Sequence, residues 1–145
     1  MAFFEWQPEF SVSVAEIDQQ HQRLIGLVNQ LHEAIEKSNQ LATMQSVLSE
    51  MDAITSTINE MIDYTIYHFS TEEKYMLEYK YPQYQQHKGE HQLFIDKVQN
   101  FKRNFENTKT RLSLDIADFI MNWWQEHILK TDKKCGIFLH QNGLS

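Results

Sequence analysis

The sequence predicts an all-α protein: an antiparallel up-down four-helix bundle with an N-terminal arm and a short C-terminal helix. The 145 residues are enough for one hydrophobic core. Only four glycines and two prolines are present, which favours long uninterrupted helices. Apolar residues also recur at helical spacing in four segments. We expect one domain over residues 1–145, with the arm at 1–15, the bundle at 16–140 and no fused signalling module.

Composition and charge narrow the class of protein. Hydrophobic residues make up 41% of the chain, which is typical of a globular protein and not of a disordered one. The net charge of −7 argues against a nucleic-acid partner, because phosphates require basic patches. Cys135 is the only cysteine, so no internal disulfide can form. The N-terminal residues show neither a secretory signal nor a membrane span, which predicts a cytoplasmic protein.

The arm and the first helix come from residues 1–39. Four aromatic residues of the arm are expected to lie across the body of the fold: Phe3, Phe4, Trp6 and Phe10. Asp18 is a favourable N-cap, so the first helix is predicted to begin there and to fade near Ser38. Its apolar stripe consists of Leu24, Val28, Leu31 and Ile35.

The second and third helices flank Pro82. The second is predicted from about Thr43 to about Tyr79, and the third begins after the proline. The stripe of the second consists of Leu48, Met51, Ile54, Ile58, Met61 and Thr65. The stripe of the third consists of Phe94, Val98, Phe101 and Phe105.

The fourth helix follows a polar link at 106–111. Its predicted stripe is Ile116, Ile120 and Trp123. A short fifth helix is expected from Asp132 to His140.

In each of the four helices the apolar stripe is continued, on the same face, by one or two histidines. They are His21, His68, His87 with His91, and His127. In an up-down bundle all five lie toward the same end, because they fall early in the first and third helices and late in the second and fourth. Each one alone is more often an ordinary core histidine. Burying five imidazoles and a carboxylate at one level of the bundle would cost on the order of several kcal/mol of folding free energy unless another group compensates for the lost hydration.

A metal ion would compensate. His68 and Glu72 are spaced i,i+4, as are His87 and His91, so each pair projects from one helix face. Buried carboxylates such as Glu72 are almost always paired. These two pairs therefore favour a metal site over isolated core histidines.

Asp132 is compatible with two roles. It follows His127 by five residues, which places the two roughly 140° apart on an α-helix. If both face one site, the helix must break near Lys130 and Thr131. The alternative is an aspartate that caps a turn, and spacing alone slightly favours it.

Four segments in this order resemble the hemerythrin family, and within it the single-domain bacteriohemerythrins. They are "IDQQH" at 17–21, "HFSTEE" at 68–73, "HKGEH" at 87–91 and "HILKTD" at 127–132. The resemblance extends from Trp6 to about Leu139. It implies a non-haem di-iron site with seven protein ligands. By resemblance, one iron would be held by His87, His91 and His127, and the other by His21 and His68. Glu72, Asp132 and an oxo or hydroxo group would bridge them, whereas His32 and His140 match no ligand position.

Counting the ligands of two octahedral ions leaves one position open, on the iron with only two histidines. This vacancy indicates reversible binding of molecular oxygen for storage, delivery or sensing. Ferritin-like oxidising sites instead use Glu-x-x-His motifs. The oxygen pocket is expected to be lined by Leu24, Ile25, Tyr64, Trp123 and Trp124, although ordinary core packing is equally compatible with these residues.

Two departures from the family pattern concern this site. Trp124 stands where the family commonly has a leucine facing the pocket, so it either narrows the pocket or rotates away and leaves a tunnel. Cys135 stands where a tyrosine often follows the bridging aspartate. We interpret Cys135 as a small apolar substitute and not as a reactive thiol.

Other functions remain open at this point. A di-iron enzyme acting on peroxide or nitric oxide would need a proton donor near the open iron, and Glu73 is expected to point away from the core. Iron storage or detoxification would need a carboxylate-rich path, which is not evident. We therefore expect an oxygen-binding protein that is not an enzyme, apart from weak oxidase or peroxidase side activity. Neither a membrane nor a nucleic acid is an expected partner, and the sequence specifies no protein partner.

Overall fold

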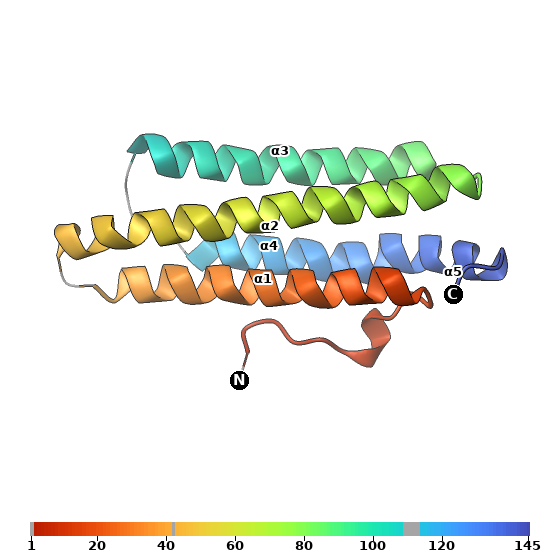
Figure 1. Cartoon of the computed structure of the whole chain (residues 1–145), viewed down its shortest axis with the longest axis horizontal. Coiled ribbons are helices and arrows are strands. Elements are labelled where there is room, and N and C mark those ends of the chain that lie inside the picture. The colour runs from red at the N-terminus through yellow and green to blue at the C-terminus, as the bar shows by residue number, and fades with distance from the viewer. Residues whose placement is uncertain (1, 42, 109–113) are drawn as a thin grey trace.

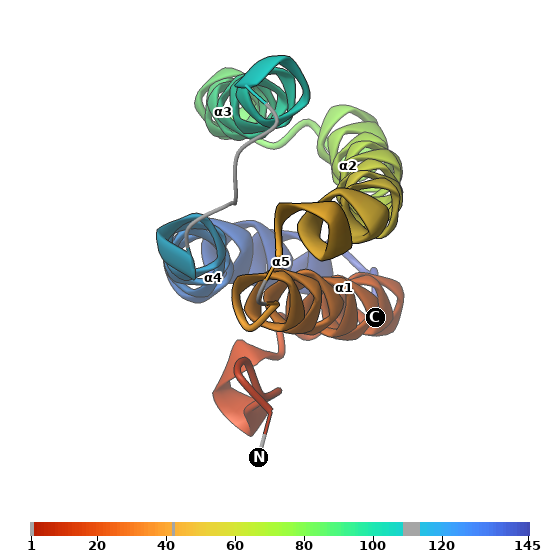
Figure 2. The same cartoon turned by 90° about the vertical axis from the view of Figure 1, so that its left-hand side faces the viewer.

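The computed structural model describes residues 2–41, 43–108 and 114–145. Four long helices alternate in direction and pack as an antiparallel bundle (Figure 1). They are α1 (Ala15–Asn39), α2 (Met44–Glu78), α3 (Tyr84–Thr108) and α4 (Leu114–Glu126). The view along the bundle shows them at the four corners, with the N-terminal arm outside (Figure 2). The predicted all-α fold class is confirmed. Among the described residues, no helix is long and apolar enough to cross a membrane.

The first helix begins earlier than the predicted N-cap. α1 starts at Ala15, and Val14 occupies the N-cap position without a side-chain cap. Asp18 instead lies in the first turn, where its carboxylate accepts hydrogen bonds from the Ser11 hydroxyl at 2.6 Å and the Val12 backbone N–H at 2.9 Å. A carboxylate here also suits the positive end of the helix dipole. Asp18 therefore ties the arm to α1 and does not start the helix.

α2 is the longest helix and begins beyond the ends of its neighbours (Figure 1). Leu48, predicted in its apolar stripe, is 47% exposed. Further along, Ile54, Ile58 and Met61 are buried as predicted. At its other end, Lys80 adopts a left-handed φ of 59°, and the chain reverses into α3.

The buried face of α4 is rotated from the predicted one and shares only Ile120 with it. Ala117, Ile120 and Trp124 are buried, whereas Ile116 and Trp123 are only partly buried. Adjacent residues on an α-helix differ by about 100°, and because Ile120 belongs to both stripes, the observed stripe is rotated by less than that angle. The predicted link at 106–111 lies partly outside the described residues.

The N-terminal arm crosses α1 and includes a short 3-10 helix, η1 (Pro8–Phe10). Asn29 of α1 holds it by bonding both the N–H and the carbonyl of Phe4, each at 2.7 Å. The predicted aromatic residues pack against the main core, with Phe4 and Phe10 buried. The far end of the arm crosses the C-terminal α5 (Lys133–Gln141) at Gly136, where an added Cβ would lie 2.2 Å from the Val12 carbonyl oxygen. Only glycine fits this crossing.

The buried apolar residues form two separate clusters along the bundle. The larger one fills most of its length and includes Leu24, Phe69, Phe94, Trp124 and Ile128. The smaller one lies toward the end where α5 packs and consists of Val12, Val14, Ile17, Met76, Tyr81, Cys135 and Leu139. In each helical segment the predicted ligands fall in the sequence between members of the two clusters. These seven predicted ligands, which we call the polar layer, are therefore flanked by apolar packing on both sides.

Candidate metal centre

The seven predicted ligands lie together in the polar layer, and all of them are buried. Their ligand atoms form two groups, each with all atoms within 4.8 Å of one another. One group contains Glu72, His87, His91, His127 and Asp132, and the other contains His21, His68, Glu72 and Asp132. The two carboxylates belong to both groups. The structure thus divides the histidines three and two, with both acids between them.

A π-helical segment brings His127 and Asp132 to the same side. This segment, η2 (His127–Asp132), follows α4 without interruption and leads directly into α5. A π-helix bonds i to i+5, so residues five apart stack on one face. The expectation that the helix must break near Lys130 and Thr131 is therefore wrong. The widened turn achieves the same result inside a continuous helix.

Asp132 faces both groups of histidines. Its Oδ1 lies 3.0 Å from His87 Nε2 and 3.0 Å from His127 Nε2. Its Oδ2 lies 2.9 Å from His21 Nε2. One oxygen thus points to each group, which is the arrangement that a carboxylate shared by two ions requires.

Glu72 lies between the groups through a single oxygen. Its Oε1 lies 3.3 Å from His68 Nε2 on one side and 3.2 Å from His91 Nε2 on the other. His87 Nε2 is farther, at 3.8 Å from the same oxygen. Since His68 precedes Glu72 by one α-helical turn, both reach the layer from α2 as the spacing predicted.

Without a metal ion, these groups perturb one another strongly. Burial alone would raise the pKa values of Glu72 and Asp132, but the surrounding histidines hold both well below their usual range. Burial lowers the pKa of His68. For His127, burial also acts to lower the pKa, but Asp132 and Glu90 outweigh it and raise the value to about 9. For His87 as well, burial acts to lower the pKa, but its contacts with Asp132 and Glu72 outweigh it and raise the value. The metal-free layer therefore holds carboxylates next to the protonated imidazoles of His87 and His127.

The donor atoms of the layer suit cations. Seven of these atoms make no aligned hydrogen bond within the described protein: His21 Nε2, His68 Nε2, His87 Nε2 and both oxygens of Glu72 and Asp132. The remaining two, His91 Nε2 and His127 Nε2, face each other at 3.2 Å. Buried polar atoms normally have partners, and exceptions need an explanation. Imidazole nitrogens and carboxylate oxygens converging in this way fit divalent transition metals such as iron.

Three polar residues hold the outer nitrogens of the histidines. His68 Nδ1 lies 2.7 Å from Gln20 Oε1, His91 Nδ1 lies 2.9 Å from Glu73 Oε2, and His127 Nδ1 lies 3.3 Å from Glu90 Oε1. The sequence reasoning missed Gln20 and Glu90 and expected Glu73 to point away. Helix periodicity shows on which face of its own helix a side chain lies, but not whether that side chain reaches a histidine on a neighbouring helix.

The predicted pocket residues do not all lie on the same side. Leu24, Ile25 and Trp124 are buried, and the Trp124 ring centroid lies 6.2 Å from that of His21 and 5.8 Å from that of His68. Trp124 thus lies beside both histidines of the two-histidine group, and it is also 6.2 Å from the ring centroid of His127.

The remaining two predicted pocket residues, Tyr64 and Trp123, are partly buried and pack against the larger apolar cluster. Trp123 stacks on His127 at 4.4 Å, next to the three-histidine group. Tyr64 also packs against Tyr67, at 5.6 Å between ring centroids.

Comparison with known proteins identifies the family. The sequence profile of the hemerythrin HHE cation binding domain matches residues 12–135. The chain belongs to the hemerythrin family. It is 30% identical over 132 residues to a bacteriohemerythrin of Clostridium acetobutylicum, covering 90% of this chain and 97% of the relative. A bacteriohemerythrin of Stenotrophomonas maltophilia is 33% identical, covering 92% of this chain and 79% of the relative.

Solved hemerythrin structures share the fold. A crystal structure of wild-type hemerythrin superposes with a TM-score of 0.80 at 27% identity, covering 95% of this chain and 98% of that chain. The structural relative and the sequence relatives therefore agree on a hemerythrin four-helix bundle, and the polar layer lies inside it.

Residues of the hemerythrin fold outside the layer have simpler environments. His32 is partly buried and stacks on Phe3 of the arm at 4.0 Å, whereas His140 is exposed. Cys135 is fully buried in the smaller apolar cluster, and this burial raises the pKa of its thiol. The thiol also neighbours His87, whose contact acts to lower the same pKa, but burial has the larger effect. A thiol kept protonated in this way agrees with a packing role.

Proposed function

We propose that this hemerythrin-family protein reversibly binds molecular oxygen at a pair of iron ions. The ligands would be the seven buried residues of the polar layer: His21, His68, Glu72, His87, His91, His127 and Asp132. The observation that carries the proposal is the unequal division of donors, five residues in one group and four in the other, with Glu72 and Asp132 in both. The hemerythrin and bacteriohemerythrin relatives support the choice of iron and oxygen.

The unequal division gives the two metal positions different roles. The position near His87, His91 and His127 has one more protein donor than the position near His21 and His68. A small ligand would therefore bind on the two-histidine side, where fewer protein donors occupy the ion. When bound, a ferrous pair supplies the electrons that reversible oxygen binding requires.

The protein surrounding the two-histidine side keeps it dry. Leu24 and Trp124 are each 1% exposed, and both belong to the larger apolar cluster. Gln20 fixes the His68 ring from outside, through its contact with Nδ1. An apolar enclosure of this kind excludes water and protons, which would otherwise promote irreversible oxidation of the iron pair.

Anaerobic reconstitution with ferrous iron tests the proposal. We expect two irons per chain and a charge-transfer absorption that develops when oxygen is admitted and disappears when it is removed. A His68→Gln variant should lose this reversible absorption, because it removes a donor of the smaller group. His32→Gln is the matched control, since His32 lies outside the layer, and it should behave as the unaltered protein does.

Adding peroxide or nitric oxide to the reconstituted protein, together with its iron content, distinguishes the other functions. A di-iron enzyme acting on peroxide or nitric oxide would turn over its substrate catalytically, with no reversible absorption. A storage protein would accumulate far more than two irons per chain. Either result would contradict reversible oxygen binding.

A further inference from the structure

We propose that Glu73 and Glu90 preorganise the three-histidine half of the centre, so that this half binds the first metal ion and holds it more tightly. The inference rests on the proposed function, because it concerns the same seven ligands. It assigns to two surface carboxylates a positioning role that neither the ligand pattern nor the family match specifies.

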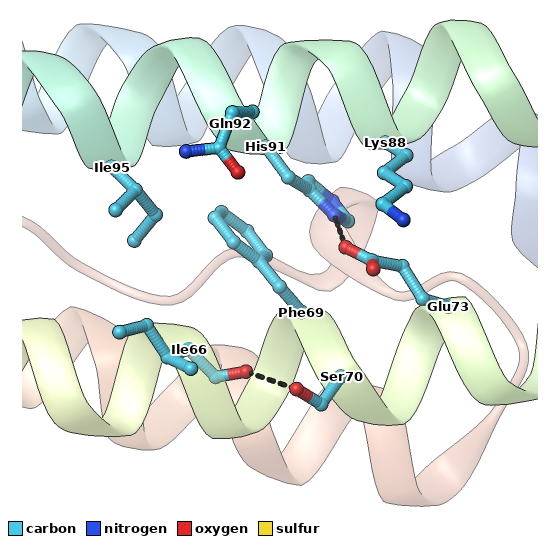
Figure 3. Close-up of a pocket in the computed structure, with 8 residues that line it drawn as sticks. All are labelled: Ile66, Phe69, Ser70, Glu73, Lys88, His91, Gln92 and Ile95. Atoms are coloured by element: carbon cyan, nitrogen blue, oxygen red, sulfur yellow. Dashed lines mark hydrogen bonds and ion pairs between the residues drawn. The ribbon is translucent and has the colours of Figure 1, made fainter.

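Glu73 positions His91 from a groove between α2 and α3. Its Oε2 lies 2.9 Å from His91 Nδ1, and its side chain is 23% exposed (Figure 3). Phe69 lines the same groove and stacks on the His91 ring at 3.6 Å with an interplanar angle of 5°. One contact fixes the ring edge and the other fixes its plane, so His91 is held before any metal binds.

Glu90 positions His127 and the π-helical segment together. Its Oε1 lies 3.3 Å from His127 Nδ1 and accepts a hydrogen bond from the Thr131 hydroxyl at 2.9 Å. These two residues belong to η2, so a single oxygen of α3 clamps the widened turn. Trp123 stacks on His127 at 4.4 Å and fixes the plane of this ring as well.

Both carboxylates determine which ring nitrogen faces the metal. An ionised carboxylate only accepts hydrogen bonds, so Nδ1 of His91 and of His127 must carry the proton. Nε2 of each ring faces the centre, and once a metal ion displaces any proton there, Nε2 presents its lone pair to the ion. Such carboxylate–histidine pairs fix the tautomer and increase the basicity of the ligand.

The two-histidine half has no comparable support. His68 is held by Gln20, a neutral amide, at 2.7 Å. Nδ1 of His21 makes no hydrogen bond within the described protein, and the same is true of Nδ1 of His87 in the three-histidine half. Each half therefore contains one histidine without an outer partner. The difference lies in the others, because two histidines of the larger half have carboxylate partners, whereas the smaller half has only the neutral amide of Gln20.

Anaerobic titration of the metal-free protein with Co²⁺, followed by visible absorption and calorimetry, tests this order. We expect two resolved steps. Glu73→Ala and Glu90→Ala should each weaken the first step by about 10- to 100-fold, as loss of a ligand's hydrogen-bond partner typically does, and leave the second step nearly unchanged. Glu73→Gln and Glu90→Gln keep a hydrogen-bond acceptor but remove the negative charge. A smaller loss of first-step affinity than in the alanine variants would measure the contribution of the hydrogen bond apart from that of the charge.

Glu126→Gln is the matched control. Glu126 directly precedes His127 but pairs with Lys130 on the surface, at 3.1 Å, and should have no effect on either step. Unaltered first-step affinity in both alanine variants, with helical content preserved, would overturn the inference. So would a Gln20→Ala variant that weakens the first step more than they do. Absence of metal binding by the unaltered protein would instead contradict the proposed function itself.

Discussion

His127 and Asp132 are five residues apart, yet His127 Nε2 lies 3.0 Å from Asp132 Oδ1. The π-helical segment between them makes this contact possible, because its wider turn returns a side chain to the same face after five residues. Asp132 then reaches His21 with its second oxygen, at 2.9 Å. The contact thus links the two groups of donors.

Replacing this carboxylate should disable both metal positions. We expect Asp132→Asn to keep the fold, since the amide has the same shape, but to lower metal affinity by more than about 100-fold, beyond the usual cost of losing an outer partner. Metal content after dialysis measures the loss. Asp118→Asn, an exposed change on α4, should retain two ions per chain. A stoichiometry of two in Asp132→Asn would show that Asp132 is not a ligand.

Trp124 should control access to the two-histidine side. It is buried beside His21 and His68, so of the two alternatives the sequence allowed, the structure favours a narrowed pocket over a rotated side chain. We expect Trp124→Leu to admit oxygen and water faster and to increase the rate of autoxidation. The decay of the oxygen-dependent absorption measures this rate.

Phe119→Leu is the control for this prediction. It makes a similar change on the same helix, where Phe119 packs against Phe101 at 5.7 Å, and should affect autoxidation much less. The cavity left by Trp124→Leu should also cost on the order of 2 kcal/mol of unfolding free energy. Equal autoxidation rates in the unaltered protein and Trp124→Leu would exclude a gating role.

The metal-free protein should lose stability between neutral and alkaline pH. The pKa of His127 is raised from 6.5 to about 9, so its contribution is fully present below pH 6.5 and is lost as the pH rises through 9. The lowered pKa values of Glu72 and Asp132 contribute in the opposite direction, and their stabilisation is lost as the pH falls into the acid range. His68, with a lowered pKa, partly opposes the alkaline loss.

Urea denaturation of the metal-free protein at pH 6 and pH 9 measures this effect. We expect lower stability at pH 9, and a smaller difference in His127→Gln, which removes the titrating ring. Metal-loaded protein should show little of the effect, because ligation requires neutral imidazoles. An identical pH dependence in His127→Gln would refute the assignment to this residue.

Gly136 should be intolerant of any side chain. A Cβ there would lie 2.2 Å from the Val12 carbonyl oxygen and 2.6 Å from Val12 Cβ, so the arm would have to move. We expect Gly136→Ala to cost about 3 kcal/mol or more. Gly89→Ala is the matched control, since its Cβ would meet nothing within 4 Å, and the gain in helix propensity should stabilise α3 by about 0.5–1 kcal/mol. Thermal denaturation distinguishes the two.

Sequence reasoning predicted the bundle and the grouping of histidines because both depend on a regular 3.6-residue period. It failed where the chain departs from that period or where neighbouring residues compete. Trp123 and Trp124 are both large and apolar, and only packing decides which one enters the core. The π-helical turn after His127 leaves no periodic signal in so short a stretch. Glu73 reaches His91 across two helices, a contact that no pattern within one helix contains.

The position of the polar layer between two apolar clusters has a consequence for how the protein unfolds. Without metal, the layer is a band of charged and poorly bonded groups separating the larger cluster from the smaller one around Met76 and Leu139. The two ends are then expected to open independently, and amide hydrogen exchange should be faster in α5 and the adjoining arm than in the middle of the bundle. Metal ligands from α1, α2, α3 and η2 would join the ends into a single cooperative unit. The metal centre would then stabilise the fold by coupling the two apolar clusters, in addition to binding its ligand.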